Sequence, residues 1–424
     1  MSDPSREGGP ADKPHRPMGS RRPRRYQLRK DAVAIVERGH PWIFRDQLSS
    51  ASGVFGDGDW LRLVDGTNRV VGHGIYEAEG AIAIRVIRRG PERPDAAWLR
   101  IQLETALRRR GPLAARTDAI RLLHGESDGI PAVVIDRFGD TLVVSSYSTG
   151  ADAVARYLAR VLGAVGMAEA EQPESCESVK RPYLVGPARH VVLRPAKRRH
   201  GSPQPTRVLR GAPPEVARIT EDGLGFAVDL AAGQKTGAYL DLRGLRHAIA
   251  TAPLEAARVL NLFAYSGMLG RAAEAAGTGS IMQVDASERA LAFAAAHHVG
   301  DPARHTFVIA DVFEWLPALD QRELFDLVIV DPPSMTSTKA QVPAALAAYR
   351  KLYRAAAPHV RDGGAIVAAC CTSRIERAAF HEVVRESLGT GFVKVRELPV
   401  ELDHPVGFPQ ADYLKIAWWR RSES

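Results

Sequence analysis

Two short segments of this 424-residue chain end in residues that can do covalent or acid–base chemistry. Asp331-Pro-Pro333 follows an apolar run at residues 325–330, and Cys370 and Cys371 end a second apolar run that starts near Ala365. Both runs are predicted to be buried strands of an open α/β sheet, because they are short and almost continuously hydrophobic. Such sheets bind their ligands at the carboxyl ends of the strands. We therefore expect both segments to lie at one ligand-binding edge.

A thiol beside a carboxylate at that edge suits methylation of carbon 5 of a cytosine. This carbon is too weakly nucleophilic to take a methyl group directly, and a thiolate that adds at carbon 6 converts the ring to a reactive enamine. Cys371 would be the nucleophile and Asp331 the acid that polarises the ring near N3, with Pro332 and Pro333 against the substrate. Cysteines are also ordinary core residues. The position at a strand end favours the catalytic role for Cys371, with Cys370 as its packed neighbour.

Two alternatives stay open at this point. Methyltransferases that act on the amino group of adenine or cytosine also carry Asp-Pro-Pro at this strand end, usually followed by an aromatic residue that stacks on a flipped base. Here Ser334 takes that place, which argues against amino methylation. The second alternative, from a different class, is a non-catalytic RNA-binding protein that kept the fold.

Four predicted strand ends in the C-terminal half carry the polar residues of a nucleoside pocket. A strand at residues 258–262 runs into a glycine-containing turn, and the next strand ends at Asp285, where a carboxylate can bind a ribose diol. The G-x-G-x-x-G pattern of NAD and FAD sites is missing, whereas S-adenosylmethionine has no phosphate and needs fewer glycines. Asp311 would contact the adenine amino group, and Lys235 or Arg243 the methionine carboxylate. The predicted cofactor residues are Lys235, Arg243, Phe263, Ala264, Tyr265, Gly267, Asp285, Ala286, Asp311, Val312 and Asp331.

Composition is that of an ordinary globular protein with a basic surface. The net charge is +8 and the pI is near 9.5, which favours a polyanionic partner such as nucleic acid. No apolar run reaches the length of a membrane span, so we expect no membrane partner. Three cysteines and a polar N-terminus indicate a cytoplasmic setting. No metal site is predicted, and the oligomeric state is left undetermined, with a homodimer as an open alternative.

The patterns divide the chain into four segments: a disordered basic tail at 1–25, a small β-barrel-like domain at 26–95, a mixed α/β domain at 96–219 with an exposed basic loop at 197–200, and a Rossmann-like α/β domain at 220–424. In the second segment, Arg38, His40 and Trp42 belong to a motif that ends at Phe44 and would suit phosphate contact and base stacking. The aromatic residues of this motif could equally be core residues beneath the barrel. Cys176, in an acidic loop of the third segment, is expected to be inert.

From about Tyr26 onward, the chain resembles the bacterial class I large-subunit (23S) ribosomal RNA cytosine-C5 methyltransferases that carry an N-terminal PUA domain. The motifs that carry this resemblance are found at residues 38–44, 125–131, 135–139, 234–243, 261–267, 370–372, 403–406 and 413–415. The resemblance implies a PUA-like RNA-binding domain at 26–95, S-adenosylmethionine as cofactor, and ribosomal RNA as partner. The family's Ser-Cys-Ser falls on Cys370-Cys371-Thr372, which assigns the nucleophile to Cys371. The chain departs from the family pattern at Ser334-Met335, at residues 266–269 and at His297-His298.

Overall fold

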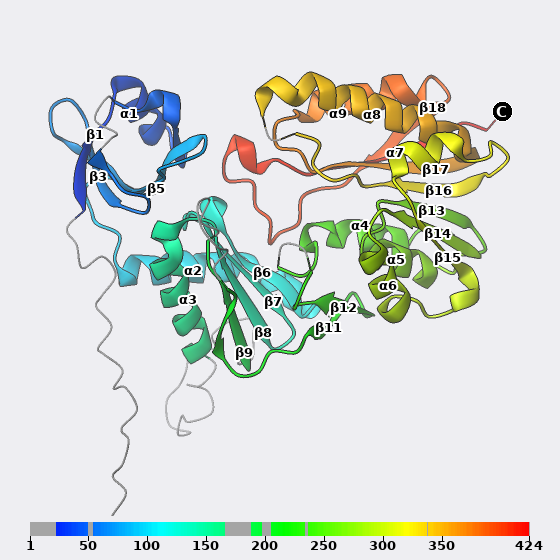
Figure 1. Ribbon diagram of the computed structural model, residues 1–424, viewed down its shortest axis with the longest axis horizontal. Helices are drawn as coiled ribbons and strands as arrows, with labels where there is room; N and C mark the ends of the chain where they lie inside the picture. Colours follow the sequence, from blue (N-terminus) through cyan, green and yellow to red (C-terminus); the bar gives the residue numbers. More distant parts are fainter. Residues whose placement is uncertain are drawn as a thin grey trace, which may run out of the picture.

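The computed structural model describes residues 23–49, 54–165, 188–196, 205–233, 236–336 and 338–423. The sequence predictions for residues 1–22, Cys176, the basic loop at 197–200 and Lys235 lie outside these ranges. Within these ranges the chain forms four sheets of five, five, two and seven strands, and the first and the last lie on either side of the second (Figure 1). The last two residues of the predicted tail, Arg24 and Arg25, belong to the first sheet.

The N-terminal domain is a small sheet covered by one helix. Its elements are β1 (Arg24–Gln27), α1 (Lys30–Glu37), β2 (Trp42–Phe44), β3 (Trp60–Val64), β4 (Val70–Tyr76) and β5 (Ile82–Arg89). The strands run in the order β1-β3-β4-β5-β2, and every pair except β1–β3 is antiparallel. Leu61, Leu63 and Ile84 pack with Val36 of α1 in the core, as the alternating sequence pattern predicts.

The middle domain is a second five-stranded sheet with two helices on one face. Its elements are α2 (Ala96–Arg109), β6 (Ala119–His124), β7 (Val133–Phe138), β8 (Thr141–Ser146), α3 (Asp152–Val165), β9 (His190–Arg194) and β10 (Arg207–Arg210). Helix α2 begins where the side chain of Asp95 accepts a hydrogen bond from the Trp98 N–H at 2.8 Å. A hairpin of β11 (Val216–Glu221) and β12 (Leu224–Asp229) follows. The boundary predicted between residues 219 and 220 therefore falls inside a strand.

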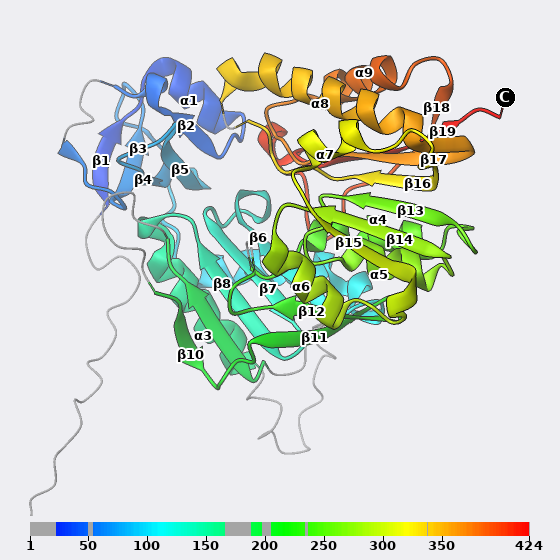
Figure 2. The ribbon, with the colours of Figure 1, turned by 45° about the vertical axis from the view of Figure 1, so that its right-hand side comes forward.

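The C-terminal domain is a seven-stranded sheet between two layers of helices. Its strands are β13 (Arg258–Leu262), β14 (Ser280–Asp285), β15 (His305–Ile309), β16 (Phe325–Val330), β17 (Val360–Cys370), β18 (Phe392–Glu397) and β19 (Lys415–Arg421). Its helices are α4 (Arg243–Ala250), α5 (Met268–Ala275), α6 (Glu288–His297), α7 (Val312–Ala318), α8 (Val342–Ala356) and α9 (Arg377–Leu388). Helices α4, α5 and α6 lie on one side of the sheet and α7, α8 and α9 on the other (Figures 1 and 2).

The strand order of this sheet, β15-β14-β13-β16-β17-β19-β18, determines where its ligands bind. Strands β13 to β17 are parallel, and β19 runs antiparallel to both of its neighbours. Residues 327–330 are fully buried, as expected for a central strand that is covered on both faces. The order in which strands are added reverses at β13 and β16, because β14 and β15 extend the sheet on one side of β13 and β16 and β17 on the other, and such a reversal opens a crevice beyond the carboxyl ends of the strands.

Candidate active site

The Asp-Pro-Pro segment and the double cysteine meet at the carboxyl ends of β16 and β17. These strands pair in parallel, and Asp331 and Cys371 each directly follow their strand. The thiol of Cys371 lies 3.7 Å from the carbonyl oxygen of Pro332. The hydroxyls of Ser334 and Thr372 are 3.3 Å apart, which links the two segments a second time. The structure therefore brings together the two segments that the sequence singles out.

The two adjacent cysteines have different environments because successive residues of a strand point to opposite faces. Cys370 is fully buried in the core cluster that includes Tyr349 and Tyr353 of α8. Cys371 is partly exposed and contacts the cluster on the other face. Only Cys371 of this pair can be reached from the pocket edge.

Lys415 contacts the carboxyl end of β17 from the neighbouring strand β19. The sequence does not predict it as a site residue. Its side chain is almost fully buried, and its ammonium group donates hydrogen bonds to the carbonyls of Thr372 at 2.8 Å and Tyr413 at 3.2 Å. Burial lowers the pKa of Lys415, although the neighbouring Cys370 opposes that shift. The local sequence offers no signal for this role, because Lys415 and Thr372 meet only through strand pairing.

Tyr239 is a second residue of the site that the sequence analysis did not select. Burial raises the pKa of the Tyr239 phenol, and the neighbouring Tyr265, Asp331 and Cys371 raise it further. The rings of Tyr239 and Tyr265 meet edge to face with centroids 5.5 Å apart. The Tyr239 hydroxyl therefore keeps its proton at neutral pH and is a hydrogen-bond donor next to the catalytic candidates.

The turn after β13 has the shape of a nucleoside-binding loop. Phe263, Tyr265 and Gly267 have φ values of +59°, +47° and +77°, and the Asp285 carboxylate accepts a hydrogen bond from the Tyr265 N–H at 2.8 Å. A Cβ atom at Gly267 would lie 2.6 Å from the Cβ of Ala294, so only glycine fits there. Asp285 also accepts from the Ser287 N–H and keeps lone pairs on both oxygens for a ribose diol.

The other predicted cofactor residues flank this loop. Ala264 is buried at the turn, where its N–H donates to the Val284 carbonyl at 3.0 Å, and Ala286 is exposed just after Asp285. Asp311 begins α7, where its side chain accepts from the Phe313 N–H at 2.8 Å, and Val312 is buried behind it. The rings of Phe263 and Phe313 are 5.6 Å apart, edge to face, which connects the ends of β13 and β15.

His298 anchors the turn at residues 263–267 through a hydrogen bond to the Ser266 carbonyl. Its Nε2 accepts a hydrogen bond from the Ala227 N–H at 2.9 Å, so Nδ1 carries the proton and donates to the Ser266 carbonyl at 2.5 Å. The ring is fully buried, and burial lowers the pKa of His298 to about 4. A neutral imidazole thus connects the hairpin strand β12 to the cofactor loop.

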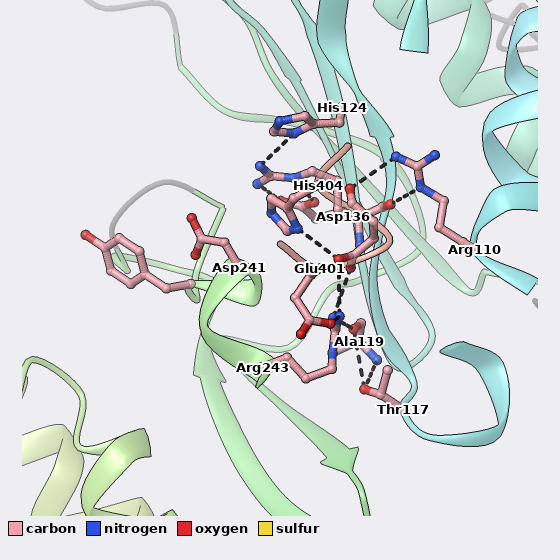
Figure 3. A network of polar contacts seen from close by, with 12 residues as sticks. Arg110, Thr117, Ala119, His124, Asp136, Asp241, Arg243, Glu401 and His404 are labelled. Atoms are coloured by element: carbon pink, nitrogen blue, oxygen red, sulfur yellow. Dashed lines mark hydrogen bonds and ion pairs between the residues drawn. The ribbon is translucent and has the colours of Figure 1, made fainter. Parts of the chain in front are cut away.

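Arg243 is enclosed in a network of polar contacts with the middle domain and the C-terminal segment, which corrects the prediction that it binds the methionine carboxylate (Figure 3). Its guanidinium is completely buried and donates to Asp403 at 3.0 and 3.2 Å, to Glu401 at 3.1 Å and to the Ala119 carbonyl at 2.7 Å. Burial alone would lower the pKa of Arg243, but the neighbouring carboxylates outweigh it and the net shift is upward. Arg243 joins the middle domain to the C-terminal segment.

The predicted RNA-binding motif of the N-terminal domain lies at a contact between domains. The ring of His40 hydrogen-bonds to Gln410 at 3.0 Å and to the Trp42 backbone, so both of its nitrogens are used within the chain. The Trp42 indole donates to Glu126 at 2.9 Å, and its ring lies 4.7 Å from that of Phe408. His40 therefore makes a contact between domains, which corrects its predicted role in RNA binding. Trp42 also lines a groove of about 760 Å³. Arg38 borders a separate hollow of about 390 Å³ beside Phe408.

The sheet order, its reversal at β13 and β16 and the antiparallel β19 are those of a class I methyltransferase. Within the described ranges, no cluster of three or more metal-binding side chains is found. In the same ranges, no helix has the length and apolar character needed to span a membrane. The fold and the loop geometry thus define a nucleoside-dependent methyl-transfer domain.

Comparison with known proteins agrees with this class. A family model described as S-adenosylmethionine-dependent methyltransferase matches residues 170–416, and a PUA-like domain model matches residues 27–89. A "Ribosomal RNA large subunit methyltransferase" of Deinococcus radiodurans is 32% identical over 93% of this chain and 96% of its own length. A "Ribosomal RNA large subunit methyltransferase I" of Alteromonas mediterranea is 30% identical over 90% of this chain and 94% of its own length. The chain belongs to this family of S-adenosylmethionine-dependent methyltransferases with an N-terminal PUA-like domain.

Solved structures show the same architecture. SMU.776, described as a methyltransferase complexed with SAH, superposes with a TM-score of 0.78 over 94% of this chain and 100% of its own, at 20% identity. A SAM-dependent methyltransferase from Streptococcus mutans gives a TM-score of 0.77 over the same shares. At this identity the likeness shows the fold alone. S-adenosylmethionine is the cofactor of the family.

Proposed function

We propose that this enzyme forms 5-methylcytidine in large-subunit ribosomal RNA, with Cys371 as the nucleophile. The observation that carries the proposal is the meeting of a partly exposed thiol with Asp331-Pro-Pro333 at adjacent strand ends. The names of the relatives, which are ribosomal RNA large subunit methyltransferases, support ribosomal RNA as the substrate. Carbon 5 needs covalent activation by a thiolate, and an amino group does not.

The cofactor residues are assigned from the shape of the nucleoside loop and the strand ends around it. S-adenosylmethionine, when bound, supplies an electrophilic methyl group. Asp285 would accept hydrogen bonds from the ribose diol, and Asp311 would accept from the adenine amino group. Phe263, Ala264, Tyr265, Gly267, Ala286 and Val312 would surround the nucleoside, and Asp331 would border the methionine end. Because Arg243 is buried elsewhere, Lys235 is the proposed partner of the methionine carboxylate.

The chain's own groups carry the covalent steps. The Cys371 thiolate adds to carbon 6 of the cytosine, which breaks the 5,6 double bond and leaves a nucleophilic carbon 5. Asp331 stabilises the enamine by a hydrogen bond to the ring near N3. After carbon 5 is methylated, loss of its proton restores the double bond and expels the thiolate. Pro332 and Pro333 fix the backbone beside the thiol, because the Pro332 carbonyl lies next to the Cys371 sulfur.

Tyr239 supports this assignment through its protonation state. A phenol that stays protonated cannot remove the carbon 5 proton at neutral pH, but it can donate a hydrogen bond to the pocket. We therefore assign Tyr239 as a donor beside Asp331 and Cys371 and not as the base.

Product analysis tests the proposal directly. Ribosomal RNA from a strain that lacks this gene is incubated with the enzyme and S-adenosylmethionine carrying a tritiated methyl group, and the RNA is digested to nucleosides. We expect label in 5-methylcytidine. Label in a nucleoside methylated on its amino group would overturn the thiolate chemistry and leave Cys371 as a structural residue. RNA binding without any label in rRNA or assembled subunits would favour the non-catalytic alternative.

A further inference from the structure

A groove of about 760 Å³ lies where the three domains meet, next to the catalytic strand ends. The N-terminal domain contributes Trp42 and Phe44, and the middle domain contributes Tyr147, the residue just after β8. Ser373 and Arg374, which follow the Cys371-Thr372 segment directly, close its catalytic end. An occupant of this groove would be continuous with a nucleotide bound at Cys371.

The aromatic residues of the groove form a rigid and partly open wall. The Tyr147 side chain is 56% exposed although it is large and mostly apolar. Trp42 is held by its hydrogen bond to Glu126, and its ring meets Phe44 edge to face with centroids 6.3 Å apart. Ring faces that are fixed by contacts between domains can stack on bases at a low entropic cost. The rest of the fold covers the Tyr147 side chain only in part, so a base could still stack on it.

The charges of the groove suit base edges along most of its length and a phosphate at one end. Asp57, Glu77 and Glu79 line it on the side of the N-terminal domain. The basic residue on that side, Arg85, is already paired with Glu77 at 2.9 Å and with Glu126. Three carboxylates face one arginine on this side, so it would repel the backbone of a duplex, whereas the amino and imino groups of unpaired bases would find acceptors.

Arg374 is the exception at the catalytic end. Within the described part of the chain it makes no ion pair or side-chain hydrogen bond, so its guanidinium is available for a phosphate. The groove therefore combines stacking faces, base-edge acceptors and one available cation. Unpaired RNA, whose bases are free to turn outward, matches this combination.

We propose that the groove holds an unpaired RNA segment that adjoins the target nucleotide, with Tyr147 stacked on a base and Arg374 bound to a phosphate. The carboxylates of Glu77 and Glu79 accept hydrogen bonds from the base edges. The inference rests on the proposed function only in requiring an RNA substrate. It adds that the substrate is single-stranded beside the methylated base.

Equilibrium binding of the full-length protein tests this proposal without any methyl transfer. The probe is a short fluorescent oligoribonucleotide, titrated at several salt concentrations. Tyr147→Leu is expected to weaken binding by about 5- to 100-fold at every salt concentration, which is the loss of one base stack. Tyr147→Phe keeps the ring and is expected to bind like the wild type. Arg374→Gln is expected to reduce the slope of log K against log salt by about 0.7, the contribution of one phosphate contact on a single strand.

Two results would overturn the proposal. Wild-type affinity of Tyr147→Leu for the oligoribonucleotide would show that the groove is not used. An equal loss of affinity for a fully paired duplex of the same sequence would show that the occupant is double-stranded. The readout separates this proposal from the chemistry, because a product other than 5-methylcytidine would leave the binding result untouched. Conversely, the wild-type enzyme could form 5-methylcytidine while Tyr147→Leu has no effect on RNA affinity. That result would support the proposed function and refute the RNA-binding role of the groove.

Discussion

Replacing Arg243 by methionine should destabilise the protein without a direct effect on cofactor binding. The substitution keeps most of the buried aliphatic volume but removes a guanidinium that contacts Asp403 and Glu401 (Figure 3). Removing one partner of a buried ion pair typically costs about 3–5 kcal/mol of unfolding free energy. Asp403 would keep its hydrogen bonds from His404 at 2.8 Å and from the Arg121 N–H at 3.0 Å. We therefore expect a loss near the lower end of this range, about 3 kcal/mol.

Urea unfolding followed by far-UV circular dichroism measures this loss. Arg243→Met should lower the urea midpoint with little change in slope, because the surface exposed on unfolding stays the same. The matched control is Arg322→Met, whose side chain is 90% exposed and pairs with Asp320, and it should leave the midpoint unchanged.

Cofactor affinity then separates the two interpretations of Arg243. Calorimetric titration with S-adenosylhomocysteine, at a temperature where the variant is folded, should give the wild-type affinity. A variant with normal stability and strongly weakened cofactor binding would refute the structural role and restore the role predicted from the sequence.

Two further predictions concern the loop that receives the nucleoside. The pKa of His298 is lowered to about 4 by burial, so the unfolded chain takes up a proton at its ordinary pKa of 6.5 before the folded chain does. Stability from neutral His298 is thus complete above pH 6.5 and falls by roughly 3 kcal/mol as the pH drops to about 4, and urea unfolding at several pH values should show a flatter dependence in His298→Gln. Gly267→Ala should cost about 1–3 kcal/mol in the same assay. It should cost more than Gly129→Ala, since Gly129 has nearly the same backbone conformation (φ +77°, ψ +6°) but its added Cβ would meet only the flexible end of the Gln102 side chain. Equal losses would contradict the argued contact with Ala294.

The sheet of the C-terminal domain is predictable from the sequence because its central strands are short, apolar and bounded by turns. Residues 325–330 and 258–262 lie in the middle of the sheet, and a strand that is buried on both faces has a continuous hydrophobic run. The residues that directly follow such strands lie at the ligand-binding edge, because the carboxyl ends of parallel strands meet at one edge of the sheet. Asp331 and Cys371 could therefore be brought together in prediction without knowledge of any long-range contact.

The errors arise where a side chain is satisfied by a distant partner. Arg243 sits in a glycine-rich polar segment that looks like a ligand loop, but its carboxylate partners are 158 and 160 residues away in the chain. His40 likewise bonds to Gln410, which is 370 residues distant. Sequence periodicity carries no information about such pairs. Lys415 and Tyr239 give no local signal for the same reason, because Lys415 reaches the site through strand pairing with Cys370 and Tyr239 through its contact with the Tyr265 ring.

The most direct test of the central claim is trapping of the thiol adduct on ribosomal RNA in which cytidine is replaced by 5-fluorocytidine. Fluorine at carbon 5 leaves no proton to lose after methylation, so the Cys371 thiolate cannot be expelled and the enzyme stays bound to the RNA. We predict a denaturation-resistant protein–RNA band that forms only when S-adenosylmethionine is present. It should persist in Cys370→Ala and vanish in Cys371→Ala. A Cys371→Ala variant that still methylates carbon 5 of unmodified cytidine would contradict the account.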